Sequence, residues 1–223
     1  MTRSTNARIA GFAFLLYIAL GVTSLFLGGT GGEGTAAQLA NIARHESAFR
    51  AGLLLSPILW FCAIALAVTL YALTRDEDPD LAMLVLVSRA GEGMIGAAAT
   101  FASLGLLWLA TLTGPAAPDA ASSQTLGSFL FKVEGWNTTI SAIFFAVGST
   151  AFSYLLLRGR MVPVALSWVG VVASVLLVVG LPLQLAGYLD GSITNLMWLP
   201  MLLFEVPLAF WLIIKGVAPR RTV

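Results

Sequence analysis

Charged residues are scarce in this sequence. Only 10% of its 223 residues are Asp, Glu, Lys or Arg, whereas 58% are hydrophobic. A soluble domain carries roughly 25% charged residues and about 45–50% apolar ones. Because so few charges cannot cover the surface of a water-soluble protein of this size, we expect a membrane protein whose main partner is the lipid bilayer. The net charge of +1 gives no reason to expect nucleic acid as a partner.

Cysteine and histidine are almost absent, since Cys62 and His45 are the only residues of their types. A single cysteine excludes an intramolecular disulfide, a dithiol redox site and a cysteine-based metal cluster. A single histidine excludes a bis-histidine haem and a multi-histidine zinc hydrolase. The sequence also contains no Walker-type phosphate loop, no dinucleotide-binding fingerprint and no HExxH motif. We therefore predict no metal site and no cofactor.

Six segments are long and apolar enough to cross a bilayer, which takes about 20 residues because the hydrocarbon layer is ~30 Å thick. The first is favoured as an uncleaved span, because no small-residue cleavage site follows it. We predict an all-α, polytopic membrane protein in which residues 1–223 form one domain, a bundle of six transmembrane helices. The predicted spans are 9–27, 51–74, 81–113, 126–157, 163–188 and 195–214. Short connections make the second and third, the fourth and fifth, and the fifth and sixth helices antiparallel neighbours.

Basic residues lie mainly on one side of these spans. If the N-terminus is inside, the outer segments hold only Arg44, Arg50 and Lys132. The cytoplasmic segments then hold Arg3, Arg8, Arg75, Arg158, Arg160, Lys215, Arg220 and Arg221. The positive-inside rule therefore predicts that both termini are cytoplasmic.

The third span contains an arginine and a glutamate, Arg89 and Glu92, which lie three residues apart and so share one helix face. They could lie at the cytoplasmic interface, because the uncharged run 93–112 is long enough to cross the membrane alone. That arrangement would leave the apolar stretch 81–87, LAMLVLV, outside the hydrocarbon. We favour the alternative, in which this stretch draws the pair roughly 12–16 Å into the membrane along the helix axis. Both residues are candidates for ligand contact or for a buried polar network.

Glu205 lies about ten residues into the sixth span, near the membrane midplane, and Pro207 follows it. A lone lipid-facing carboxylate at that depth is costly. Glu205 should therefore be protonated, or paired with a cation from another helix, for which Arg89 is the nearest candidate by depth. Such a pair could serve only to fix helix packing, or it could belong to a functional site.

A second group of polar residues lies near the outer ends of the spans. His45 and Arg50 precede the second span, and Lys132, Glu134 and Asn137 enter the fourth. These five residues are candidates for an outer-side polar cluster. The alternative is that they are ordinary helix-end polar groups, and this alternative is the stronger one.

Small residues four apart recur in the third span, as in Gly93 with Ala97 and Ala98 with Ala102. This spacing lets helix backbones approach closely. It predicts that the third helix lies at the centre of the bundle.

Several short motifs in this order resemble those of a family of bacterial membrane proteins known as the domain of unknown function 4386 family. They are HESAFRAG at the second span, LAMLVLVSRAGEG at the third, GSTAFSYLLLRGRMVPVALSWVG across the fourth and fifth, and LPMLLFEVPLAFWLIIKG in the sixth. The resemblance covers nearly the whole chain and implies a six-helix protein of the bacterial inner (plasma) membrane. It implies no activity and no catalytic residues.

Three functions remain open on this basis. The first is binding or transport of a small or lipid-like ligand within the bundle, through Arg89, Glu92 and Glu205. The second is a non-catalytic structural or regulatory subunit, with a membrane protein or a second copy of the chain as its partner. The third is a membrane-embedded enzyme in which Glu92 or Glu205 is an acid or base. The third is the weakest, because no nucleophile or metal constellation accompanies the carboxylates.

Overall fold

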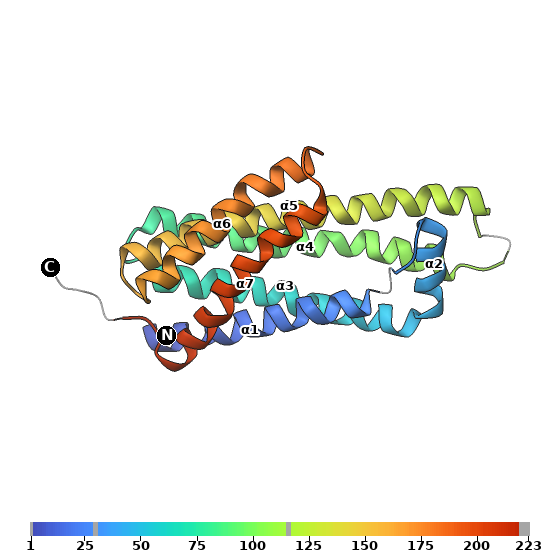
Figure 1. Ribbon diagram of the computed structural model, residues 1–223. Helices are drawn as coiled ribbons and strands as arrows, with labels where there is room; N and C mark the ends of the chain where they lie inside the picture. Colours follow the sequence, from blue (N-terminus) through green and yellow to red (C-terminus); the bar gives the residue numbers. More distant parts are fainter. Residues whose placement is uncertain (1, 29–30, 115–116, 219–223) are drawn as a thin grey trace.

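Seven α-helices and no strands make up the described part of the chain, residues 2–28, 31–114 and 117–218 of a computed structural model (Figure 1). Six of them contain a stretch long and apolar enough to cross a membrane, which confirms the predicted all-α, six-span protein. The chain is therefore a multi-pass membrane protein. The helices are α1 (Arg3–Leu27), α2 (Thr35–Arg44), α3 (Glu46–Thr74), α4 (Pro79–Thr111), α5 (Ala120–Arg158), α6 (Val164–Leu185) and α7 (Gly191–Ile214).

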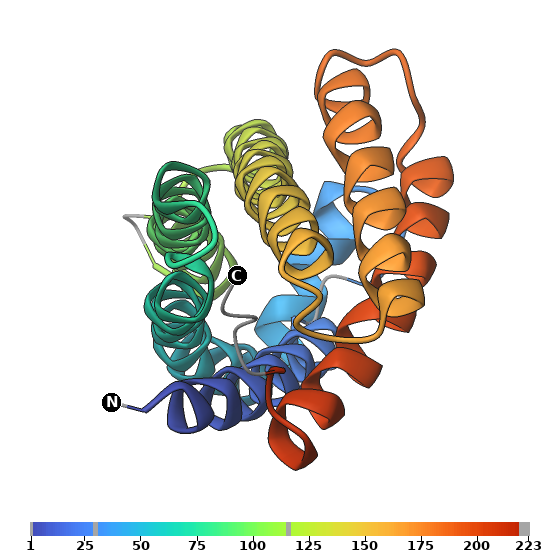
Figure 2. The ribbon, with the colours of Figure 1, turned by 90° about the vertical axis from the view of Figure 1, so that its left-hand side faces the viewer.

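The six long helices form a closed ring in the order α1, α3, α4, α5, α6, α7, in which α7 packs back against α1 (Figure 2). The three expected antiparallel pairs, α3–α4, α5–α6 and α6–α7, are neighbours in this ring. Helices α4 and α7 stand opposite each other and their backbones do not meet. A side chain that points inward from α4 therefore faces α1, α5 and α7.

The prediction that the third helix lies at the centre of the bundle is wrong. That helix, α4, is one wall of the ring and packs between α3 and α5. The close approach inferred from its small residues is nevertheless present, because a Cβ added at Gly93 would lie 3.1 Å from the carbonyl oxygen of Trp60 on α3. Small residues thus bring α4 close to its neighbour in the wall, and the ring interior is filled by side chains.

At the end of the bundle opposite the start of α1, the helices extend further than the sequence suggested. Helix α3 begins at Glu46 and α5 at Ala120, several residues before the predicted spans. The unpredicted helix α2 packs against both of them and against α4. It buries Leu39 and Ile42 in a second hydrophobic cluster, separate from that of the ring. No membrane span was predicted here because α2 has only 10 residues and is amphipathic.

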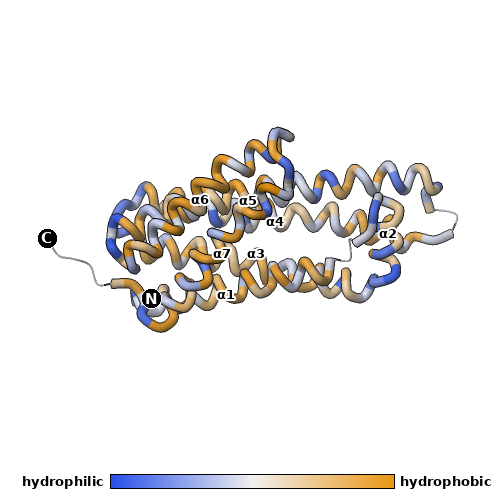
Figure 3. The backbone as a smooth tube through the Cα atoms, viewed as in Figure 1, coloured by the Kyte–Doolittle hydropathy of each residue, from blue (hydrophilic) through white to orange (hydrophobic). Residues whose placement is uncertain are grey.

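Polar residues lie mainly at the two ends of the long axis, and apolar residues cover the helices between them (Figure 3). Large apolar side chains are exposed on the outside of several helices, among them Phe61, Phe101 and Leu203. An outer surface of this kind is suited to contact with lipid. The interior cluster draws buried residues from all six ring helices.

Aspartates cap the starts of three helices. The Asp78 carboxylate accepts the backbone N–H of Leu81 at 3.1 Å, and Pro79 follows as a first-turn proline. Arg158, at the end of α5, donates to the other Asp78 oxygen at 2.9 Å. The Leu81 N–H and the Arg158 guanidinium hold the pKa of Asp78 below its ordinary value of 3.8. Asp78 thus joins the start of α4 to the end of α5.

This cap predicts a pH-dependent contribution to stability. The pKa of Asp78 is lower in the folded chain than in the unfolded chain, so its carboxylate stabilises the fold at every pH above the unfolded-state pKa. This stabilisation is lost as the pH falls through the folded-state pKa. Asparagine is an equally good N-cap, so Asp78→Asn removes mainly the charge. We expect this variant to unfold more readily than the wild type near pH 7 and equally readily below pH 3, in detergent melts. A difference in stability between the variant and the wild type that stayed constant from pH 7 to pH 3 would contradict this role of the Asp78 charge. Asp119→Asn is the control, because Asp119 also caps a helix but has no arginine partner in the described residues.

Candidate functional site

Arg89 lies inside the ring, in the third turn of α4, with a side chain that is 1% exposed. Three aromatic rings surround its guanidinium. The Cζ atom is 4.8 Å from the ring centre of Phe145 on α5, and 5.7 and 5.9 Å from those of Tyr17 and Phe14 on α1. Each of these distances is within the range of a cation–π interaction. Arg89, which the sequence made a candidate site residue, is thus fully enclosed by the bundle.

Glu92 lies beside Arg89 on the same face of α4. One of its oxygens, Oε2, is 3.0 Å from Arg89 Nη1, and the two side chains are 1% and 3% exposed. The phenol of Tyr17 donates a hydrogen bond to the other oxygen, Oε1, at 2.5 Å. The hydroxyl of Ser141 on α5 donates to the backbone carbonyl of Glu92 at 2.9 Å. Glu92 thereby links α1, α4 and α5 at one level of the bundle.

The hydrogen-bonding capacity of Arg89 is largely unused. Although Nη1 is close to Glu92 Oε2, their geometry is not that of a hydrogen bond, and Nε, Nη1 and Nη2 have no aligned acceptor in the described residues. The Glu92 Oε2 atom likewise receives no aligned donor. A guanidinium carries five N–H donors, and buried donors without acceptors are expensive. Arg89 therefore keeps N–H donors without an aligned acceptor among the described residues.

Glu205 belongs to the same site but comes from the opposite wall of the ring, on α7. It is 6% exposed, and in the described residues it makes no hydrogen bond and no ion pair within 4 Å. Arg89 and Glu92 are the charged groups that act on it electrostatically. The direct partner of Arg89 is therefore Glu92 of its own helix, and the Arg89–Glu205 pair, one of the two alternatives for Glu205, is not formed. We call Tyr17, Arg89, Glu92 and Glu205 together the interior site.

A glycine on α5 makes room for the arginine. A Cβ added at Gly148 would lie 3.3 Å from both Cγ and Cδ of Arg89 and 3.1 Å from Cβ of Ser88. Sequence reasoning missed Gly148 and the aromatic residues around the guanidinium, because their role depends on which helices are neighbours. Of these residues, only Tyr17 could have been noticed in the sequence, because its phenol lies in the middle of an apolar span.

Among the described residues, none of the five outer-side candidates forms a hydrogen bond or ion pair with another of the five. Arg50 pairs with Glu46 of its own helix at 2.6 Å, and both side chains are largely exposed. Ser103 on α4 donates to Glu134 at 2.5 Å, and Asn137 donates to the carbonyl of Ile95 at 3.0 Å. The last two contacts join α4 to α5.

The other two outer-side candidates, His45 and Lys132, are exposed. A ring nitrogen of His45 lies 3.1 Å from the carbonyl oxygen of Asn41, one turn earlier in the chain. The contacts of the five residues are thus those of helix ends and helix packing, which fits the alternative stated for them.

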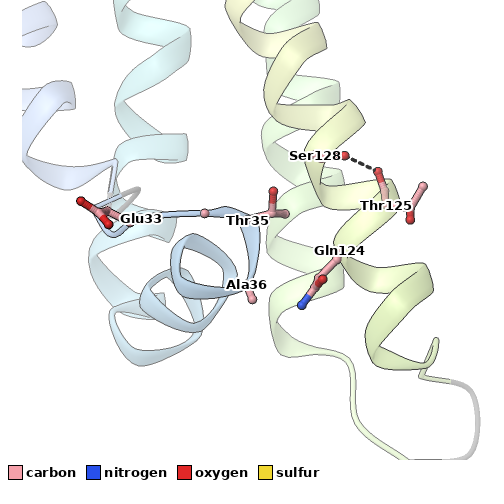
Figure 4. Close-up of a pocket in the computed structure, with 7 residues that line it drawn as sticks. Glu33, Thr35, Ala36, Gln124, Thr125 and Ser128 are labelled. Carbon is pink, nitrogen blue, oxygen red and sulfur yellow. Dashed lines mark hydrogen bonds between the residues drawn. The ribbon is translucent and has the colours of Figure 1, made fainter.

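A groove lies between the start of α2 and the first turns of α5 (Figure 4). Its hydroxyls are partly engaged within α5, since Ser128 donates to the carbonyl of Thr125 at 2.8 Å. None of the candidate site residues predicted from the sequence lines this groove. Its lining consists of Glu33, Gly34, Thr35, Ala36, Gln124, Thr125 and Ser128.

No group of three or more His, Cys, Asp or Glu side chains that could hold a metal ion occurs in the part of the chain that the structure describes. The interior site draws its groups from α1, α4 and α7. It combines one strong cation, two carboxylates and a phenol in surroundings shielded from water. Such a group can hold a proton, or an ion or polar group that reaches it through the bundle.

A known protein family matches this chain. The family described as "Domain of unknown function (DUF4386)" matches residues 9–216, which include most of α1, the other five spanning segments and every residue of the interior site. No curated protein and no solved structure matches the chain. Since the match covers well over half of its length, the chain belongs to the DUF4386 family of proteins of unknown function.

Proposed function

We propose that this protein binds or transports a small or lipid-like ligand in the interior site of its helix bundle. The observation that supports the proposal is the Arg89 guanidinium, which is 1% exposed and whose three nitrogens lack aligned acceptors. An arginine kept only for packing would be expected to have its donors satisfied, because a buried unsatisfied donor costs about 1–3 kcal/mol. A ligand with acceptor oxygens would satisfy them.

The proposal includes the location and orientation of the chain. We propose that it lies in the bacterial plasma (inner) membrane with its N-terminus in the cytoplasm, because one end of the bundle concentrates basic residues. The start of α1 and the ends of α3, α5 and α7 lie at that end (Figure 1). Its basic residues are Arg3, Arg8, Arg75, Arg158, Arg160 and Lys215, while Arg220 and Arg221 lie outside the described residues. Such clustering is typical of the cytoplasmic side.

Extraction of bound molecules tests the ligand proposal. The wild type, Arg89→Gln and Glu205→Gln are purified from native membranes in mild detergent, and their organic and aqueous extracts are compared by untargeted mass spectrometry. We expect at least one molecule that the wild type retains to fall about tenfold in Arg89→Gln, which corresponds to about 1.4 kcal/mol of binding free energy. Arg50→Gln is the matched control, because it removes an exposed arginine that is also paired with a glutamate of its own helix.

The comparison is restricted to variants that remain monodisperse, so that misfolding does not mimic ligand loss. Identical extracts from the wild type, both interior variants and the control would overturn the proposal. If a second membrane protein co-purified instead, with no associated small molecule, the regulatory-subunit function would be favoured.

A further inference from the structure

The interior site contains one more negative than positive group. Arg89 is its single cation, and Glu92 and Glu205 are its two carboxylates. Glu92 has the close ion pair with Arg89 and the hydrogen bond from Tyr17. Glu205 has neither, although it is 6% exposed. An ionised carboxylate without a partner inside a membrane bundle is strongly disfavoured, and a proton removes the charge at little cost.

The helices that pack against α7 provide no further cation for Glu205. Helix α6 contains no titratable residue. Helix α1 carries Arg3 and Arg8 near its start, but its group that interacts with Glu205 is the phenol of Tyr17. Arg89 and Glu92 face it from α4, across the ring. Besides its burial, the charge of Glu205 therefore depends on Arg89 and Glu92.

We propose that Glu205 is a proton-binding site in the middle of the bundle, and that Arg89 sets its proton affinity by dividing its donors between Glu92 and Glu205. With the proton bound, Arg89 and Glu92 form a neutral pair and Glu205 is an uncharged carboxylic acid. When the proton leaves for water, the O–H bond of Glu205 breaks and a carboxylate remains. The unaligned N–H donors of Arg89 can then turn toward it.

The backbone of α7 is suited to such a change. Pro200 and Pro207 lie within the helix, one on each side of Glu205. Each lacks the backbone N–H that would close a helical hydrogen bond, so this part of α7 bends more readily than an uninterrupted helix. The proposal concerns the same site as the proposed ligand and names the proton as one occupant, but it does not require the other ligand.

Infrared spectroscopy of the full chain in lipid nanodiscs tests the proposal. A carboxylic acid shielded from water gives a C=O stretching band separate from those of carboxylates and amides, and the band shifts in D₂O. We expect this band in the wild type at neutral pH, and we expect its loss in Glu205→Gln. Glu134→Gln is the control, because it removes a partly exposed carboxylate of the outer end and should leave the band unchanged.

The two other charged groups should shift the titration of this band in opposite directions. Arg89→Gln removes the cation that stabilises the carboxylate, so the band should persist to a pH higher by about one unit or more, a tenfold change in proton affinity. Glu92→Gln frees Arg89 for Glu205, so the band should disappear at a pH lower by about the same amount. Should Arg89→Gln fail to fold, the wild type and the milder Glu92→Gln still decide the question.

A band that survives in Glu205→Gln would overturn the proposal, and so would a Glu92→Gln shift toward higher pH. These outcomes differ from failure of the ligand proposal. If extraction finds no retained molecule but the band behaves as described, the proton site stands without a second ligand. If a ligand is retained but the band is absent, the ligand site stands and the proton site fails.

Discussion

Replacing Arg89 with methionine is expected to lower the free energy of unfolding by about 3–5 kcal/mol, the cost of removing one partner from a buried ion pair. Methionine keeps most of the volume of the arginine stem, which packs against Gly148, so the loss should come from charge more than from an empty space. Glu92 would remain 2% exposed with its phenol donor but without its cation. Thermal or denaturant unfolding in detergent, followed by tryptophan fluorescence, measures the change.

A second substitution distinguishes loss of charge from loss of shape. In Arg89→Met with Glu92→Gln, no unpaired charge is left beside Tyr17, and we expect most of the lost stability to return. Replacement of a buried ion pair by neutral groups of similar volume is often neutral or stabilising. If the double variant were as unstable as Arg89→Met alone, the packing around the guanidinium would be the main contribution, and the aromatic rings of Phe14 and Phe145 would be the next residues to change.

The Arg50–Glu46 pair is the matched control for this experiment. Like Arg89 and Glu92, its residues lie within one helical turn of each other, but their side chains are 57% and 42% exposed. Exposed pairs of this kind contribute about 0–1 kcal/mol. Arg50→Met should therefore leave the unfolding transition nearly unchanged, and a loss equal to that of Arg89→Met would mean that burial does not determine the effect.

The sequence predicted the membrane-spanning helices well because length and hydropathy determine them almost directly. Helix ends were predicted less well. The polar, small residues 120–125 look like a loop in isolation, yet Asp119 caps a helix that runs through them. Helix α2 was missed for a related reason, since its stability comes from packing on α3, α4 and α5 rather than from its own composition.

The interior site was predicted in part. Residue spacing placed Arg89 and Glu92 on one face, and depth along the helices suggested that Glu205 and Arg89 lie at one level. Depth does not say which helices are neighbours, so it could not show that α4 and α7 stand on opposite sides of the ring. Across that distance, the local pair with Glu92 forms in preference to one with Glu205. The rings of Phe14, Tyr17 and Phe145 belong to α1 and α5, and no pattern in the sequence connects those helices to Arg89.

The closure of the ring between α1 and α7 depends on a glycine. A Cβ added at Gly11 would lie 2.6 Å from the carbonyl oxygen of Ala209 and 2.7 Å from Cγ1 of Ile213, both on α7. The first of these is a backbone atom, so it cannot move aside without displacing the helix. Helix α1 carries Tyr17 and α7 carries Glu205, so this contact also positions two sides of the interior site.

Gly11→Leu is therefore expected to lower the free energy of unfolding by at least about 3 kcal/mol, the upper end of the usual range for an overfilled core. The reason is steric, since even the first side-chain atom has no room beside α7. Gly21→Leu is the control in the same helix, because a Cβ there meets nothing within 4 Å and the side chain would face open space. Leucine is a better helix former than glycine, so the control should be neutral or slightly stabilising.

The same pair of variants shows whether the α1–α7 contact and the interior site are connected. If Gly11→Leu separates the two helices, Glu205 moves away from Tyr17 and Arg89, and water gains access to its carboxyl group. The protonated C=O band proposed for Glu205 should then weaken or shift in Gly11→Leu and stay unchanged in Gly21→Leu. A stable Gly11→Leu protein with an unaltered band would mean that the ring tolerates the added side chain. The closeness of α1 and α7 would then matter neither for stability nor for the charge state of the site.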